Sequence, residues 1–171
     1  MKKIELSAGT IEYVDTGGSG PTLVLLHGLM MDASLWDELI SGLSADHRCV
    51  APTLPLGAHR HAMRPDADLS LRGTARLVAE FLERLDLRDV TLVGNDTGGA
   101  LVQLLMCDGA APVGRVVLAS CDAFDRTDNW PKWTTATPSS PWTSRRDSLG
   151  SSETSQAWAP GEEWISGRGG R

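Results

Sequence analysis

Strand-like and helix-like segments alternate along the first 125 residues, and this alternation is the feature that most constrains the fold. Short runs that alternate, or that are rich in Leu and Val, predict strands at 4–6, 11–14, 22–26, 48–51, 90–93 and 113–119. Apolar residues three or four positions apart predict helices at 32–43, at 71–85 with Ser70 as the cap, and after Gly99. Strands that alternate with helices form parallel sheets with right-handed crossovers. The sequence therefore predicts an α/β fold with a mostly parallel sheet and helices on both faces.

The composition changes near residue 126. Between 126 and 171 the only aliphatic side chains larger than Ala are Leu149 and Ile165, and this stretch holds five of the six tryptophans. Such a composition buries too little apolar area to offset an ordering entropy of roughly 1–2 kcal/mol per residue. We therefore expect a core at 1–125 and a disordered, low-complexity tail at 126–171. The tail is either a partner-binding segment or, as its unusual composition favours, the product of a frame shift near 125–129.

Charge and cysteine spacing narrow the classes of partner. The net charge of −6 gives no surplus of Lys and Arg, so a nucleic-acid partner is not expected. Cys49, Cys107 and Cys121 lie in or beside apolar runs without the paired spacing of a zinc site, which predicts thiols in a reducing cytoplasm. No signal peptide and no run of about 18 apolar residues is found. We expect a cytoplasmic protein that acts on a small molecule and uses no metal, cofactor or membrane; the oligomeric state is left open.

The segment Gly94-Asn95-Asp96-Thr97-Gly98-Gly99 follows a predicted buried strand and opens a predicted helix. This is the context of a nucleophile elbow, in which small residues two positions before and after the nucleophile allow a sharp bend. Gly94 and Gly98 occupy those positions around Asp96. A dinucleotide-binding turn would need Gly where Asp96 stands, and a phosphate-binding loop would need Gly-Lys-Ser/Thr. An ordinary turn in which Asp96 caps the helix is the remaining alternative.

His27-Gly28-Leu29 follows the predicted strand at 22–26. Together with the Asp96 elbow, this turn resembles the N-terminal portion of the α/β-hydrolase fold superfamily, over residues 1 to about 125. The resemblance implies an oxyanion hole formed by two main-chain N–H groups, those of Leu29 and Thr97. It also implies that His27 is a structural residue that braces loops and not a catalytic base.

With an aspartate at the elbow, the sequence resembles the branch of this superfamily that contains haloalkane dehalogenases and epoxide hydrolases. The resemblance implies that Asp96 attacks a saturated carbon and forms a covalent alkyl ester, which a water activated by histidine then hydrolyses. The sequence departs from both enzymes. Thr97 follows the nucleophile where dehalogenases usually have Trp, and Met30 stands where epoxide hydrolases usually have Pro.

All four histidines, at 27, 47, 59 and 61, precede Asp96, whereas in this fold the base follows the nucleophile. Asp122 and Asp125 are candidate acids, but no later histidine is present for them to orient. We therefore expect a truncated, inactive hydrolase chain, with 113–119 as an unpaired, aggregation-prone edge strand. The alternatives are an esterase-like hydrolase, and a non-catalytic remnant of the fold whose Trp-rich tail binds a partner.

Overall fold

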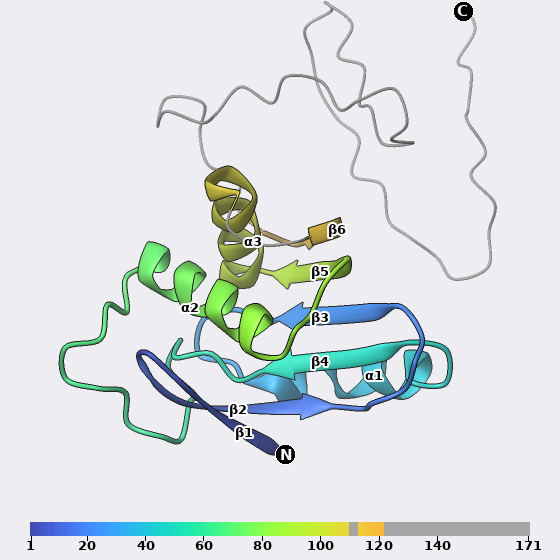
Figure 1. Ribbon diagram of the computed structural model, residues 1–171, viewed down its shortest axis with the longest axis horizontal. Helices are drawn as coiled ribbons and strands as arrows, with labels where there is room; N and C mark the ends of the chain where they lie inside the picture. Colours follow the sequence, from blue (N-terminus) through green and yellow to red (C-terminus); the bar gives the residue numbers. More distant parts are fainter. Residues whose placement is uncertain (110–112, 122–171) are drawn as a thin grey trace, which may run out of the picture. The chain divides into compact units, whose positions relative to one another are not determined.

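Six strands form a mixed sheet in the order β1-β2-β4-β3-β5-β6 in the computed structural model, which describes residues 1–109 and 113–121 (Figure 1). The strands are β1 (Lys2–Leu6), β2 (Gly9–Asp15), β3 (Thr22–Leu26), β4 (Arg48–Pro52), β5 (Val90–Asn95) and β6 (Val113–Ala119). β1 and β2 form an antiparallel hairpin, and β2 pairs antiparallel with β4. The pairs β4–β3, β3–β5 and β5–β6 are parallel. The predicted α/β class with a mostly parallel sheet is confirmed.

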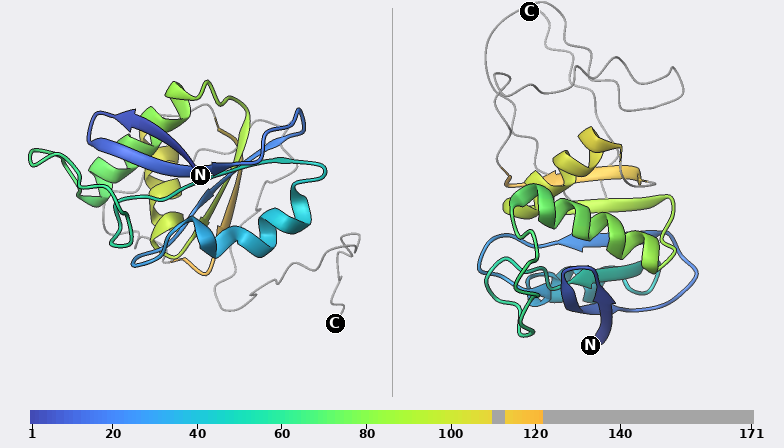
Figure 2. Two further views of the ribbon diagram at one scale, coloured as in Figure 1. Left: turned by 90° about the horizontal axis from the view of Figure 1, so that it is seen from below. Right: turned by 60° about the vertical axis from the view of Figure 1, so that its left-hand side comes forward.

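Helices cover both faces of the sheet, as predicted (Figure 2). The helices α2 (Leu71–Arg84) and α3 (Thr97–Asp108) lie on one face, and α1 (Asp37–Leu43) lies on the other. The prediction of a single helix at 32–43 is wrong in one respect, because the segment begins as a separate 3-10 turn, η1 (Ala33–Trp36). The carboxylate of Asp32 accepts hydrogen bonds from the Ser34 N–H (2.9 Å) and hydroxyl (2.6 Å), which tightens this first turn.

Two apolar clusters, one on each face, hold the layers together. The larger one includes Phe81 and Leu82 of α2, Leu101 of α3, and Val24 and Leu92 of the central strands, all at most 1% exposed. The stripe of α2 that the sequence predicted is therefore buried, and the predicted cap is confirmed, since the Ser70 hydroxyl accepts a hydrogen bond from the Gly73 N–H (3.0 Å). The smaller cluster gathers Trp36, Cys49 and their neighbours against α1.

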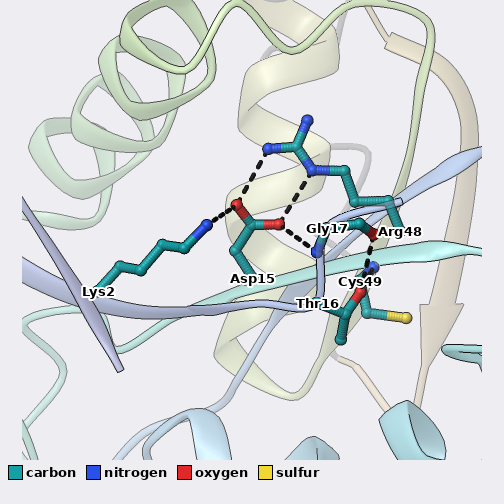
Figure 3. A network of polar contacts seen from close by, with 6 residues as sticks. All are labelled: Lys2, Asp15, Thr16, Gly17, Arg48 and Cys49. Carbon is teal, nitrogen blue, oxygen red and sulfur yellow. Dashed lines mark hydrogen bonds and ion pairs between the residues drawn. The ribbon is translucent and has the colours of Figure 1, made fainter. Parts of the chain in front are cut away.

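A polar network joins the ends of β1, β2 and β4 (Figure 3). The carboxylate of Asp15 accepts hydrogen bonds from Lys2 Nζ (2.7 Å), from Arg48 Nε and Nη2 (3.0 and 3.1 Å) and from the Gly17 N–H (3.0 Å). The guanidinium of Arg48 holds the pKa of this carboxyl well below its usual range. The network therefore fastens the antiparallel part of the sheet to its parallel part.

The strand order reverses at β3, and the carboxyl ends of β3 and β5 lie side by side at this point. The chain leaves β3 through α1 to reach β4 on one side, and returns through α2 on the other face to reach β5 on the opposite side. Loops that follow neighbouring parallel strands diverge at such a point, and ligands bind there in α/β proteins. His27 and Asp96 are the residues that directly follow these two strands.

Parts of the predicted organisation fall on residues that the structure does not describe. The tail expected at 126–171 and the candidate acids Asp122 and Asp125 lie outside 1–109 and 113–121. Cys49 is buried, whereas Cys107 and Cys121 are only half-buried. Within the described ranges, no helix combines the length and the hydropathy that a membrane crossing requires.

Candidate active site

Asp96 occupies a strained turn between β5 and α3. Its backbone has φ 50° and ψ −123°, a region that side-chain-bearing residues rarely adopt and that costs about 1–3 kcal/mol. The neighbouring glycines permit this turn, because a Cβ on Gly94 would lie 2.6 Å from the Gly98 oxygen and one on Gly98 would overlap the carbonyl oxygen of Leu26. The local geometry is that of the elbow that the Gly-x-Asp-x-Gly spacing predicted.

The carboxylate of Asp96 points across to the loop that follows β3. Its Oδ2 accepts a hydrogen bond from the Leu29 N–H (3.1 Å), and the Thr97 hydroxyl donates to the same oxygen (3.4 Å). Gly28 permits the approach, since a Cβ there would lie 2.7 Å from the Asp96 Cβ and overlap the carboxylate. The fold thus brings Asp96 and Leu29, which belong to two separate turns, into contact. For Thr97 the observed contact is made by the side chain, and the role expected of its main-chain N–H stays a prediction.

Asp96 does not cap its own helix. Although it occupies the N-cap position of α3, its side chain makes no capping hydrogen bond to the N–H groups of the first turn. A capping aspartate would satisfy one of those amides. The interpretation of this segment as an ordinary capped turn is therefore wrong, and the carboxylate is used to contact the β3 loop.

The end of β6 supports the elbow from its other side. The carbonyl oxygen of Ala119 accepts hydrogen bonds from the Asp96 N–H (3.4 Å) and from the Asn95 side-chain amide (3.1 Å). The Asp96 carbonyl in turn accepts from the N–H groups of Gly99 (2.9 Å) and Ala100 (3.4 Å), which starts α3. The position of the carboxylate therefore depends on three neighbouring segments: the loop after β3, helix α3 and strand β6.

His27 is fully buried beneath the Leu29 loop and uses both ring nitrogens in structural contacts. Its Nδ1 donates to the Gly28 carbonyl (2.8 Å), and its Nε2 accepts from the Leu54 N–H (2.8 Å). A carbonyl can only accept and an amide N–H can only donate, so the ring is held as one neutral tautomer. Desolvation lowers the pKa of His27, which reinforces the neutral form. The prediction that His27 braces loops is confirmed.

The loop that contacts Asp96 exposes three apolar side chains. Leu29, Met30 and Met31 are 58%, 72% and 39% exposed, and they follow His27 and Gly28 directly. Met30 has a positive φ of 59°, and its N–H donates to the Leu56 carbonyl (2.9 Å), which fixes the loop against the segment after β4.

Of the other histidines, His61 has an ion-pair partner, which is not Asp96. His59 and His61 belong to the loop between β4 and α2, and His61 Nε2 lies 3.2 Å from Glu12 Oε1 on β2. Within residues 1–109 and 113–121, the partners of the Asp96 carboxylate come from Leu29 and Thr97. In the same ranges no group of three or more His, Cys, Asp or Glu side chains could hold a metal ion.

The family comparison agrees with this geometry. A family model described as "Alpha/beta hydrolase family" matches residues 23–169. The chain belongs to the alpha/beta hydrolase family. The match includes both the His27-Gly28 turn and the Asp96 elbow, the two motifs on which the resemblance was based.

Two curated relatives are similar to this chain and carry different names. A haloalkane dehalogenase of Mesorhizobium japonicum is 37% identical over 99 residues, which cover 58% of this chain and 31% of the relative. The magnesium-chelatase 30 kDa subunit of Rhodobacter capsulatus is 35% identical over 123 residues, which cover 68% of this chain and 42% of the relative. The chain thus spans well under half the length of either relative.

Solved structures share the fold of this alpha/beta hydrolase. A putative lipase from Acinetobacter baumannii superimposes with a TM-score of 0.67 at 24% identity, covering 74% of this chain and 42% of the lipase. A putative ancestral haloalkane dehalogenase gives a TM-score of 0.62 at 24% identity, covering 71% of this chain and 42% of that protein. At this level of identity the likeness concerns the fold alone.

Proposed function

We propose that Asp96 is the nucleophile of a hydrolase that forms a covalent alkyl-ester intermediate. The observation that carries the proposal is the Asp96 carboxylate, which stands on a strained elbow and accepts a hydrogen bond from the Leu29 N–H instead of capping α3. A carboxylate in this position is a nucleophile for saturated carbon. The similarity to a haloalkane dehalogenase supports the same chemistry.

In the first step a carboxylate oxygen of Asp96 attacks a saturated carbon that bears a halide or belongs to an epoxide. The new C–O bond forms as the carbon–halogen or ring C–O bond breaks. The electron pair of the broken bond leaves with the halide, or stays on the ring oxygen, which remains attached to the alkyl group and takes a proton from water. Oδ2 is held by Leu29 and Thr97 (3.1 and 3.4 Å), so the carboxylate keeps one orientation during attack.

In the second step water attacks the carbonyl carbon of the ester, and negative charge develops on the former carboxylate oxygen. The N–H groups of Leu29 and Thr97 are the donors that would stabilise this charge. The water must lose a proton to a base, and all four histidines of the 171-residue sequence precede Asp96. His27 is excluded as that base because both of its ring nitrogens are engaged. We therefore propose that this chain by itself stops at the ester and does not turn over.

The proposed substrate is a small, uncharged alkyl halide or epoxide. The exposed side chains of Leu29, Met30 and Met31 beside the carboxylate favour an apolar molecule. Thr97 in place of Trp removes a halide donor that dehalogenases usually have, and Met30 in place of Pro departs from the epoxide hydrolases. Both substrate types therefore belong in the test.

The experiment is intact-protein mass spectrometry after incubation with 1-bromobutane or with 1,2-epoxybutane. We expect a single added butyl or hydroxybutyl group that maps to Asp96 and persists after the reagent is removed. Asp96→Asn is the matched control, because Asn also tolerates a positive φ and keeps an acceptor for the Leu29 N–H while it loses the nucleophilic carboxylate. Equal labelling of the wild type and of Asp96→Asn would refute the role of Asp96.

Turnover is measured separately as halide or diol released per protein molecule. Release of at most one equivalent is expected. Many equivalents, abolished by Asp96→Asn, would leave the nucleophile in place and disprove the arrest at the ester. If neither label nor product forms with either reagent, or with a simple ester, the alternative of a non-catalytic member of the family is favoured, in which the Trp-rich segment at 126–171 binds a partner.

A further inference from the structure

Asn95 is the last residue of β5 and directly precedes Asp96. The three residues before it, Leu92, Val93 and Gly94, are buried, whereas Asn95 is half-buried and ends the strand with a side-chain amide. Asparagine is depleted in strands, because its side chain fits poorly on a pleated, half-buried surface. An asparagine at this position therefore calls for a specific contact of its side chain.

The side chain of Asn95 binds the main chain of the neighbouring strand. Its Nδ2 donates to the carbonyl oxygen of Ala119, the last residue of β6, at 3.1 Å. A carbonyl can only accept, so the NH₂ group of the amide faces it. Side chains of a strand usually stand perpendicular to the sheet, whereas this contact runs within the sheet from β5 to β6.

The same carbonyl oxygen accepts the N–H of Asp96. This main-chain bond is long (3.4 Å), and the side-chain bond from Asn95 is shorter (3.1 Å). The paired residues of β5 and β6 end with Asn95 and Ala119, and Ser120 has a φ of 46°, so the regular strand stops directly after this point. The amide of Asn95 is therefore the closer of the two donors that hold the Ala119 carbonyl in front of Asp96.

Two arrangements compete for the carboxylate of Asp96. At the N-cap of α3 an aspartate normally has an extended backbone and accepts from the second or third helical N–H, here that of Gly98 or Gly99. Asp96 instead accepts from the Leu29 N–H (3.1 Å), on a backbone with φ 50° and ψ −123°. A backbone in so rare a region persists only where the surrounding contacts hold it. On the β6 side of the turn, those contacts are the two bonds to Ala119.

We propose that Asn95 is a positioning residue for the nucleophile. Its amide holds the Ala119 carbonyl where this carbonyl binds the Asp96 N–H, and thereby keeps the carboxylate turned toward Leu29 and away from the first turn of α3. This role rests on the proposed function, in which the carboxylate attacks the substrate. Without the amide, the end of β6 moves away from the elbow, the strained turn relaxes, and Asp96 caps α3 instead.

The rate at which 1-bromobutane or 1,2-epoxybutane labels Asp96, followed by mass spectrometry with peptide mapping, is the first test. Asn95→Ala removes the amide, and Asn95→Asp keeps its shape but places an oxygen in front of the Ala119 carbonyl. We expect both variants to be labelled about fivefold more slowly, the factor that corresponds to one hydrogen bond. Thr91→Ala is the matched control, since Thr91 is a half-buried residue of the same strand that pairs with Arg115; it should be labelled like the wild type.

Hydrogen exchange of main-chain amides, measured by NMR on the full chain, tests the position of the carboxylate without any reaction. The Leu29 N–H is bonded to the Asp96 carboxylate (3.1 Å). The N–H of Met30, the next residue, is bonded to the Leu56 carbonyl (2.9 Å). In Asn95→Ala the Leu29 amide should exchange about fivefold faster, whereas the Met30 amide should keep its wild-type rate. The same spectra report whether each variant is folded.

Two results would overturn the role of Asn95: an Asn95→Asp variant labelled as fast as the wild type, or an unchanged exchange rate of the Leu29 amide in Asn95→Ala. Slower labelling with equal acceleration of the Leu29 and Met30 amides would also overturn it, because Asn95 would then only stabilise the fold. If the wild type takes no label, the proposed function fails by itself, and the exchange rates still decide whether Asn95 positions the carboxylate.

Discussion

Replacement of His27 by leucine should destabilise the protein by about 4 kcal/mol. Leucine has a similar size but no polar atoms, so the change removes both bonds of the ring, those to the Gly28 carbonyl and to the Leu54 N–H (2.8 Å each). His27 is 0% exposed and Leu54 is 1% exposed, so water does not replace these partners. A buried polar group left unpaired costs about 1–3 kcal/mol, and two such groups give about 2–6 kcal/mol.

Two further variants measure separately how much each of the two His27 hydrogen bonds contributes to the free energy of unfolding. His27→Asn places an amide near the position of Nδ1 and can restore the donor to Gly28, whereas His27→Gln reaches toward Nε2 and can restore the acceptor for Leu54. Each should recover roughly half of the loss, about 1–3 kcal/mol. His59→Leu, in the loop after β4, should stay within about 0.5 kcal/mol of the wild type.

Urea unfolding followed by far-UV circular dichroism gives these free energies, because the signal comes from the folded helices and strands. A His27→Leu variant within about 1 kcal/mol of the wild type, or no more affected than His59→Leu, would show that the two bonds do not hold the loops together. Equal stability of the Leu, Asn and Gln variants would also contradict the argument, since only the leucine leaves both partners unpaired.

Three other predictions concern His27, Asp15 and Gly28. Because desolvation lowers the pKa of His27, the contribution of this residue to stability is complete above the ordinary pKa of 6.5 and falls as the pH drops below that value. The pH dependence of the urea midpoint between pH 8 and 5 should therefore be weaker in His27→Gln than in the wild type. The pKa of Asp15 is also lowered, so its contribution is complete above 3.8 and is lost at more acidic pH; Asp15→Asn should be less stable near pH 6 and differ least near pH 2. Gly28→Ala should slow labelling of Asp96 at least about tenfold, as measured by mass spectrometry, and cost about 1–3 kcal/mol, since the new Cβ overlaps the carboxylate.

Features set by local sequence were predictable. The bounds of β3 and β6 agree with the expected segments, because each is a short apolar run ended by a turn residue or by a change in polarity. The cap at Ser70 and the bend at Asp96 were predictable for the same reason, since each depends on residues within about three positions. The separate 3-10 turn before α1 was not, because a helical spacing of apolar residues does not distinguish the two helix types over one turn.

Features set by distant contacts could not be derived from periodicity. The bond between Leu29 and Asp96 joins residues 67 positions apart, and only the resemblance to a known fold placed them together. No sequence pattern indicated the Asp15 network, because Lys2, Asp15 and Arg48 are far apart in the sequence and come together only when β2 pairs with β4. The contact of the Thr97 hydroxyl with Asp96 was likewise missed, because the motif draws attention to the main-chain N–H of that position.

The conformation of Asp96 also bears on why an aspartate stands there. A glycine would adopt φ 50°, ψ −123° without the strain of about 1–3 kcal/mol, and α3 gains no capping bond from the aspartate in return. The hydrogen bonds of the carboxylate in the described ranges, with the Leu29 N–H and the Thr97 hydroxyl, hold the side chain at the carboxyl ends of β3 and β5. If those contacts merely stabilised the loops, Asp96→Gly would destabilise the protein by more than the strain it relieves. A gain in stability on Asp96→Gly, together with loss of labelling, is the combination expected of a residue kept for chemistry at the expense of folding.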